Sequence, residues 1–146
     1  MDSNPPKPVV LRFDEIEIGR EAYFNRTITE KDLKQFAEIT GDYNPLHFDE
    51  EYARNTRFKK RIAPGLLTSS FYSRLIGMVL PGRQALYLSQ EFKFVKPVFI
   101  GDTLTIKGLV SEKIPGKNNC IILDTEITNQ DNIIVLTGKA RVMIRD

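Results

Sequence analysis

The sequence predicts an α+β domain in which one long buried helix is wrapped by a curved antiparallel β-sheet. The run GLLTSSFYSRLIGMVL, residues 65–80, is apolar on nearly every side, which is typical of a helix buried on most of its faces. After it come four segments with alternating or β-branched residues, separated by short turn signals. Strands joined by short turns pair antiparallel. We therefore expect two layers, one helical and one a sheet with a half-polar outer face.

Length and composition limit the possible classes of protein. A chain of 146 residues is long enough for about one domain, and its net charge of +2 does not suggest a nucleic-acid partner. No apolar run approaches the roughly 20 residues that span a membrane. The single cysteine excludes an intramolecular disulfide and fits a reducing, cytoplasmic location. We expect residues 1–8 to form a flexible, proline-stiffened tail and residues 9–146 to form one domain.

The first half of that domain begins with a mixed, strand-like segment at residues 9–28. A capping box follows, with Thr29 as the N-cap hydroxyl and Asp32 as the acid three residues later. Apolar residues at helical spacing continue from there to Thr40. Gly41 stands where a C-terminal glycine ends a helix.

The remaining elements follow from turn residues and alternation. A short helix is expected at residues 49–58, then a basic loop, and then the buried helix at residues 65–80, which Pro81 and Gly82 end. The four strands are expected at residues 84–95, 103–113, 119–129 and 133–144.

The stretch GDYNPLHF contains the only histidine of the chain, His47, five residues after Asp42. Pro45 disfavours the α conformation at Asn44, so a turn can bring the two side chains together. Asp42 also follows the C-terminus of a predicted helix, where a carboxylate costs about 0.3–1 kcal/mol. That unfavourable position supports a functional role. The alternative is an Asx–Pro turn beside a histidine that binds a nearby carbonyl.

Three segments together resemble one enzyme family. ITGDYNPLHFDEEYA resembles the hydratase motif of the MaoC-like, (R)-specific enoyl-CoA hydratases, which have the hot-dog fold. RIAPGLLTSSFYS resembles the segment that leads into the central helix of that family, and FKFVKPVFIGDTL resembles its strand-turn-strand signature. The resemblance covers roughly residues 29–144, with Pro64 where the family often has a histidine. The motif positions that match are Gly41, Asp42, Asn44, Pro45, Leu46, His47 and Ala53.

The resemblance implies a site and a reaction for this chain. Asp42 and His47 would hold one water molecule and add it reversibly across a trans-2-enoyl thioester, which makes the protein a hydro-lyase. Gly65, in the first turn of the buried helix, has a backbone N–H without an internal partner and would form the oxyanion hole. Ser73 and Asn44 are auxiliary candidates, although a helical serine more often bonds its own backbone and an asparagine here can serve the turn alone. No metal and no cofactor are expected.

The same resemblance implies a thioester of coenzyme A or of acyl-carrier protein as substrate, a place in fatty-acid metabolism, and a homodimer joined edge to edge.

Two other functions stay open. An acyl-CoA thioesterase of this fold commonly has an acid on the central helix, and residues 65–80 contain none. A non-catalytic acyl-CoA-binding module has no need of both Asp42 and His47. Seven basic residues are candidates for the coenzyme's phosphates: Arg57, Lys59, Lys60, Arg61, Arg83, Lys93 and Lys96.

Overall fold

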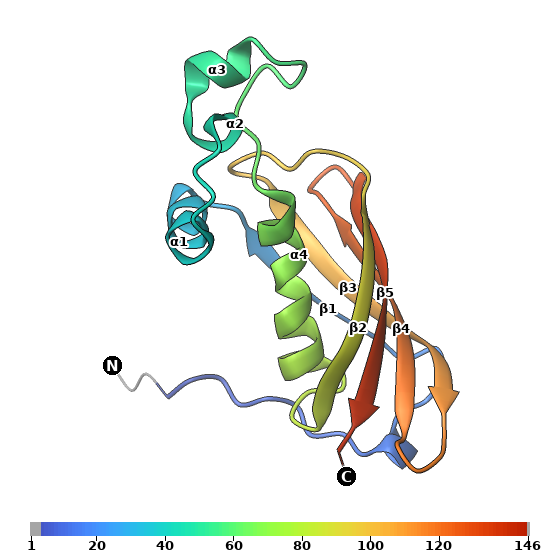
Figure 1. Cartoon of the computed structure of the whole chain (residues 1–146). Coiled ribbons are helices and arrows are strands. Elements are labelled where there is room, and N and C mark those ends of the chain that lie inside the picture. The colour runs from blue at the N-terminus through green and yellow to red at the C-terminus, as the bar shows by residue number, and fades with distance from the viewer. Residues whose placement is uncertain (1–3, 146) are drawn as a thin grey trace.

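The computed structural model of the protein describes residues 4–145 (Figure 1). Its helices are η1 (Phe13–Glu15), α1 (Glu30–Thr40), α2 (Pro45–Phe48), α3 (Glu50–Arg54), α4 (Gly65–Arg74) and η2 (Leu75–Val79). Its strands are β1 (Glu21–Thr27), β2 (Ala85–Phe94), β3 (Thr103–Ile114), β4 (Cys120–Thr128) and β5 (Ile134–Ile144). Residues 1–3 of the expected tail lie outside the described residues, and the division into a tail and one domain stays a prediction.

The five strands form one antiparallel sheet in the order β1-β3-β4-β5-β2. Figure 1 shows this sheet curving around α4, with α1, α2 and α3 outside the sheet near the end where α4 begins. The predicted α+β architecture, a central helix wrapped by a curved antiparallel sheet, is therefore confirmed. Within the described residues, no helix is both long and apolar enough to cross a membrane.

The central helix is buried as its sequence predicts, but it changes form near its end. Tyr72, Leu75 and Ile76 have side chains that are at most 1% exposed and pack against the sheet. From Leu75 to Val79 the chain winds as a π-helix, and the N–H of Leu80 donates to the carbonyl of Leu75 at 2.8 Å. The predicted element is therefore an α-helical segment followed by one wider turn.

The four predicted strands after the central helix all exist, with ends that agree with the prediction to within a few residues. Residues 9–28 are less regular than a strand-like segment, because only β1 is a strand. The 3₁₀ turn η1 precedes it, and the buried Ile16 packs between them against the core. Gly19 turns the chain between η1 and β1 with a φ of 93°, a left-handed conformation that favours glycine.

The capping box of α1 is confirmed atom by atom. The Thr29 hydroxyl accepts from the N–H of Asp32 at 3.2 Å, and the Asp32 carboxylate accepts from the N–H of Thr29 at 2.9 Å. Gly41 ends the helix in the left-handed conformation, and its N–H donates to the carbonyl of Ala37 at 2.8 Å. Both ends of α1 are thus determined by local sequence, and Asp42 follows directly after the C-cap residue Gly41.

Asp32 is expected to make the fold sensitive to acid. Burial alone would raise the pKa of its carboxyl, but the N–H of Thr29 and the guanidinium of Arg26 outweigh burial and hold the pKa below its ordinary value of 3.8. The stabilising effect of the carboxylate is therefore present above pH 3.8 and is lost as the pH falls through the lower pKa of the folded state. We expect Asp32→Asn to lower the free energy of unfolding by about 1 kcal/mol at neutral pH, measured by urea denaturation.

The difference between wild type and Asp32→Asn should shrink as the pH falls below 3.8, because the Asp32 carboxylate then takes up a proton more readily in the unfolded chain than in the folded one. Asp14→Asn is the matched control, because Asp14 pairs with Arg12 at 3.4 Å and both side chains are exposed. It should change the unfolding free energy by less than about 0.5 kcal/mol. A difference between wild type and Asp32→Asn that stays constant from pH 7 to pH 3 would contradict this assignment.

Candidate active site

The segment between α1 and α3 is more regular than the predicted turn, because residues Pro45–Phe48 form the one-turn helix α2. Asn44 is the N-cap of this turn, with φ −53° and ψ 131°, and its side-chain oxygen accepts from the N–H of Leu46 at 2.9 Å. Pro45 occupies the first helical position, where its missing N–H costs nothing. His47 is therefore presented from a short helix that Asn44 and Pro45 together define.

Asp42 and His47 come together across this turn, as predicted. The Oδ2 atom of Asp42 lies 4.0 Å from the Nε2 atom of His47, which is too long for a direct hydrogen bond. The other carboxylate oxygen, Oδ1, accepts from the N–H of Asn44 at 3.1 Å. The pair is therefore set at a fixed spacing, with Oδ2 directed at the histidine.

The hydrogen bond made by the second ring nitrogen of His47, Nδ1, determines whether Nε2 can act as an acceptor. Nδ1 lies 2.7 Å from the carbonyl oxygen of Ile62. Because a carbonyl oxygen only accepts hydrogen bonds, Nδ1 carries the hydrogen, and in the neutral ring Nε2 is left as an acceptor. Two acceptors, Nε2 of His47 and Oδ2 of Asp42, thus face each other.

A water molecule matches this arrangement. It has two hydrogens to donate, and contacts of roughly 2.8 Å to both atoms are compatible with their 4.0 Å separation. Its lone pairs would then point away from both acceptors. The side chain of Asp42 is 43% exposed and that of His47 is 12% exposed, so the pair sits at the surface end of the site. Chemically, the arrangement can hold a water and remove a proton from it.

Gly65 begins α4 directly after Pro64, which is the N-cap residue. Within residues 4–145 the N–H of Gly65 has no hydrogen-bond partner, as expected for the first turn of a helix. A Cβ atom at Gly65 would lie 2.6 Å from the Cε1 atom of Phe94. Glycine at this position therefore leaves room for the phenylalanine ring, which any larger residue would displace.

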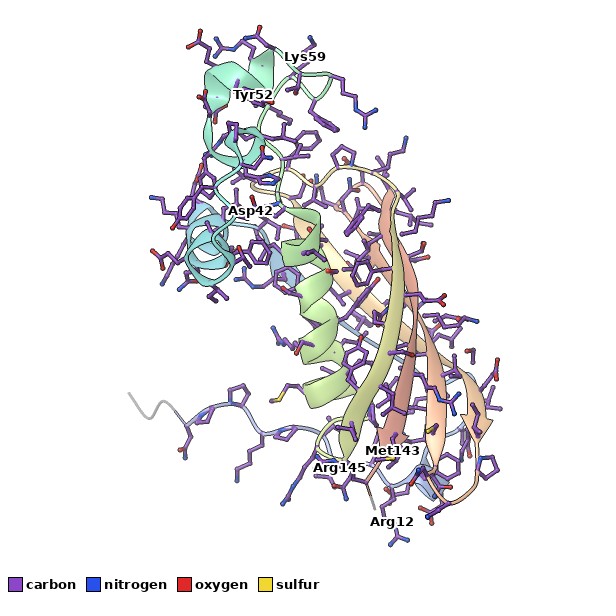
Figure 2. All side chains as sticks on the ribbon, in the orientation of Figure 1. Arg12, Asp42, Tyr52, Lys59, Met143 and Arg145 are labelled. Atoms are coloured by element: carbon purple, nitrogen blue, oxygen red, sulfur yellow. The ribbon has the colours of Figure 1, made fainter. Side chains whose placement is uncertain are left out.

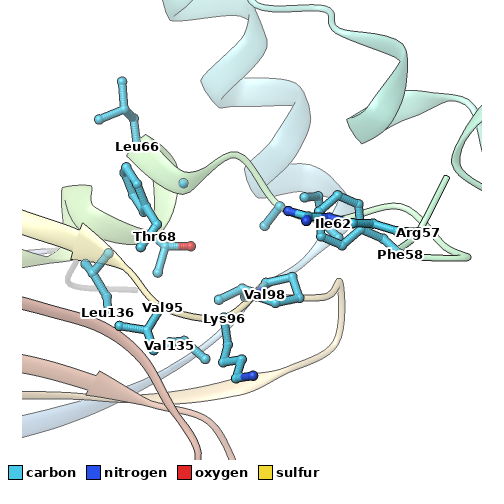
Figure 3. Close-up of a pocket in the computed structure, with 14 residues that line it drawn as sticks. Arg57, Phe58, Ile62, Leu66, Thr68, Val95, Lys96, Val98, Val135 and Leu136 are labelled. Atoms are coloured by element: carbon cyan, nitrogen blue, oxygen red, sulfur yellow. The ribbon is translucent and has the colours of Figure 1, made fainter.

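A cavity of about 380 Å³ opens at the N-terminal end of α4, and Gly65 lines it (Figure 3). Most of its lining is apolar and comes from the loop before α4, from α4 itself, and from β2, β5 and the segment after β2. The apolar side chains in the wall include Phe58, Ile62, Leu66, Phe94, Val95, Val98, Val135 and Leu136. Such a lining suits an acyl group rather than a charged ligand.

Ile62 connects the Asp42–His47 pair to this cavity. Neither Asp42 nor His47 lines the cavity in the single chain. The backbone carbonyl of Ile62 holds the ring of His47, and the side chain of the same residue lines the cavity. In Figure 2 Asp42 lies at the end of the molecule where α4 begins. Ile62 therefore links the pair to Gly65, because its carbonyl contacts His47 and it lies three residues before Gly65 in the chain.

The structure does not bring Ser73 to this cavity. Ser73 is exposed and lines a second hollow, of about 300 Å³, together with Tyr72, Tyr87 and Gln90. Burial raises the pKa of Tyr72 to about 12 and also raises the pKa of Tyr87. The polar groups of this hollow between α4 and β2 are therefore neutral hydroxyls and an amide, and the auxiliary role of Ser73 stays a prediction.

Charge at the cavity comes from two of the seven basic candidates, Arg57 and Lys96, which both line it (Figure 3). Arg61 is engaged elsewhere, because it forms ion pairs with Glu30 of α1 and Glu50 of α3. These two ion pairs fix the loop that leads to α4. Within the described part of the chain, no group of three or more histidine, cysteine, aspartate or glutamate side chains is placed to hold a metal ion.

Sequence reasoning missed two features of the site. Phe94, at the end of β2, packs on Gly65 although 29 residues separate them, and nothing in the sequence signals that contact. Thr68 lines the cavity and is 2% exposed. Its position three residues after Gly65 on the same helix was a signal that could have identified it.

Comparisons with known proteins agree with one another. The family model described as "MaoC like domain" matches residues 14–131. The chain is 39% identical over 139 residues to the 3-hydroxybutyryl-CoA dehydratase of Methylorubrum extorquens, covering 95% of this chain and 87% of that protein. It is 39% identical over 138 residues to the (R)-specific enoyl-CoA hydratase of Rhodospirillum rubrum, covering 90% of each. The unliganded R-hydratase of Pseudomonas aeruginosa superposes with a TM-score of 0.86 at 39% identity, covering 92% of this chain and 85% of that one.

Proposed function

The chain belongs to the MaoC-like domain family, and from that premise we propose that it is an (R)-specific enoyl-CoA hydratase with Asp42 and His47 as its acid–base pair. The reaction is reversible, so the same enzyme is a 3-hydroxyacyl-thioester dehydratase in the opposite direction. The observation that carries the assignment of the pair is the 4.0 Å spacing of two acceptor atoms, Oδ2 and Nε2, which suits one water molecule.

Hydration begins with that water. Its oxygen attacks C3 of the enoyl thioester while one of its protons passes to the Asp42–His47 pair. The electrons of the C2–C3 double bond move toward the thioester, which becomes an enolate, and the pair then returns a proton to C2. The product carries the hydroxyl at C3 and the new hydrogen at C2, and the pair ends in its starting state. No cofactor takes part in this redox-neutral addition.

Gly65 would stabilise the enolate. Its unpaired N–H lies at the positive end of the α4 dipole, where it can donate to the thioester oxygen as negative charge develops there. Removing one such donor typically costs about 2.7–4 kcal/mol in other enzymes. The substrate would then lie across Ile62, with its carbonyl at Gly65 and C3 at the water between Asp42 and His47.

The lining of the cavity suits a thioester substrate whose carrier bears phosphate groups. Its apolar interior suits the acyl portion, and Arg57 and Lys96 in its wall provide positive charge for phosphate groups. Coenzyme A and the phosphopantetheine arm of acyl-carrier protein share this chemistry. A role in fatty-acid metabolism follows from such substrates. A cytoplasmic location stays a prediction from the single, buried Cys120.

The thioesterase alternative is less well supported by the geometry. From Gly65 to Val79 the central helix carries no carboxylate to act as base or nucleophile, and the described residues that line the second hollow beside it include no carboxylate either. A module that only binds acyl-CoA would use the cavity and not the water site. The spacing of Asp42 and His47 therefore favours the hydratase.

Crotonyl-CoA tests the proposal directly. The wild-type protein should remove the absorbance of the conjugated enoyl thioester and produce the (R)-3-hydroxy product, identified by chiral analysis. Release of free thiol with retention of the double bond would instead indicate a thioesterase. Binding without any reaction would indicate a module that only binds acyl-CoA.

We also propose a homodimer formed through β2. This strand is at the edge of the sheet and pairs on one side only, with β5. Its exposed apolar side chains include Leu86, Leu88 and Phe92, which are 43%, 48% and 36% exposed. A ten-residue edge strand that exposes apolar side chains readily pairs with another strand, and antiparallel pairing of the two β2 strands would cover the open side of each.

We expect the wild-type protein to have the mass of two chains in size-exclusion chromatography with light scattering. Phe92→Glu should shift it toward the mass of one chain, because a buried charge in the paired edge is unfavourable. Tyr23→Glu is the matched control on the opposite edge strand, where Tyr23 is 65% exposed, and it should leave the dimer intact. Dissociation by Tyr23→Glu but not by Phe92→Glu would place the interface on β1 instead.

A further inference from the structure

Thr68, one turn after Gly65 on α4, has a hydroxyl that the fold leaves without a hydrogen bond. Its side chain is 2% exposed, and among the described residues Oγ1 has no partner. The next two residues behave differently, because Ser69 donates to the carbonyl of Leu66 at 3.1 Å and Ser70 donates to that of Leu67 at 2.6 Å. Such a bond to the preceding turn is the usual arrangement for a helical hydroxyl.

The unpaired hydroxyl faces the cavity. Thr68 lines it, and Figure 3 shows the side-chain oxygen pointing into the open space on the side that Val98 and Ile62 line. Thr68 is also the one uncharged hydrogen-bonding side chain among the described residues of the wall. Valine has nearly the same shape and would fill this position without burying an unpaired polar group. Packing alone therefore gives no reason for a hydroxyl here.

The position of Thr68 relative to Gly65 indicates what the hydroxyl binds. Residues three apart on a helix share a face, so the Thr68 O–H and the unpaired Gly65 N–H are two donors at the same end of one cavity. A thioester oxygen has two lone pairs and accepts from two donors at once. Its negative charge grows as the enolate forms, which strengthens both hydrogen bonds.

The geometry points to Thr68 as a second donor to the thioester oxygen, beside Gly65. This inference rests on the proposed function and adds a residue to that site. Thr68 transfers no proton in the reaction: its O–H bond stays intact, and the hydrogen bond it donates is shortest at the enolate. Thr68 therefore acts on the transition state more than on the bound substrate.

Thr68→Val and Thr68→Ser separate this role from a structural one. With crotonyl-CoA, Thr68→Val should lower kcat about 10- to 100-fold with KM within about threefold, whereas Thr68→Ser should keep most of the activity. The Tm of Thr68→Val should equal or exceed that of wild type, because an unpaired buried hydroxyl has been removed. Ser69→Ala is the matched control, since its hydroxyl is already bonded within the helix, and it should leave kcat unchanged.

Butyryl-CoA, a saturated thioester that cannot be hydrated, reports on binding alone. Calorimetry should give Kd values for wild type and Thr68→Val within about threefold of each other, because the Thr68 donor acts mainly on the enolate. If wild type turns over crotonyl-CoA and Thr68→Val does so equally well, the role of Thr68 is wrong and the hydratase stands. If Thr68→Val weakens butyryl-CoA binding and leaves kcat unchanged, Thr68 binds the substrate and does not stabilise the enolate, which also overturns its role. If wild type does not turn over crotonyl-CoA, the hydratase assignment is wrong and the role of Thr68 at the enolate is wrong with it.

Discussion

Asp42→Asn is expected to lower kcat/KM for crotonyl-CoA at least about 100-fold while the protein stays folded. Asparagine keeps an oxygen that can accept from the N–H of Asn44, as Oδ1 of Asp42 does at 3.1 Å, so the local turn is preserved. The atom that faces His47 becomes an amide N–H₂, which donates instead of accepting. The water then loses one of its two acceptors, and the site loses a charge that can take a proton.

Asp49→Asn is a matched control for this variant. Asp49 lies seven residues further along and caps α3 by accepting from the N–H of Tyr52 at 2.9 Å. Asparagine is an equally good N-cap residue. The control variant should therefore keep near-normal activity, and circular dichroism should show both variants folded. Near-normal activity of Asp42→Asn would remove Asp42 from the mechanism.

His47→Gln is expected to cause a loss of similar size, again at least about 100-fold. Glutamine can donate to the carbonyl of Ile62, as Nδ1 of His47 does at 2.7 Å, but its amide is not a base that can accept a proton from water. His47 is the only histidine in the chain, so no other imidazole can replace it. Steady-state hydration of crotonyl-CoA measures the effect.

His47→Ala extends this test, because it leaves a space beside Asp42 that a free imidazole can enter. Added imidazole should restore part of the lost activity in His47→Ala and none in Asp42→Asn. Rescue of both variants, or full activity of His47→Gln without imidazole, would show that the ring of His47 does not act on the water.

The sequence predicts best the features that depend on neighbouring residues. The capping box of Thr29 and Asp32 and the left-handed Gly41 are local, and the structure has them as predicted. The convergence of Asp42 and His47 is also local, because Asn44 and Pro45 between them determine the turn. The sequence did not predict that this turn is helical, since four residues are too few for a periodic pattern.

Features that depend on distant contacts could not be read from the sequence. The tautomer of His47 follows from the carbonyl of Ile62, 15 residues away, and the space above Gly65 is filled by Phe94 from β2. Thr68 lies in a run with Ser69 and Ser70, three hydroxyl residues that are equivalent in sequence. Only the packed structure shows that the hydroxyl of Thr68 alone faces the cavity without a partner.

A double-mutant cycle tests most directly whether Asp42 and His47 act together on one water. The kcat/KM values for crotonyl-CoA are measured for wild type, Asp42→Asn, His47→Gln and the double variant. Since both residues would serve the same water, the double variant should be about as slow as the slower single variant. A double variant whose loss equals the product of the two single losses would show that the residues act independently, and would contradict the shared water.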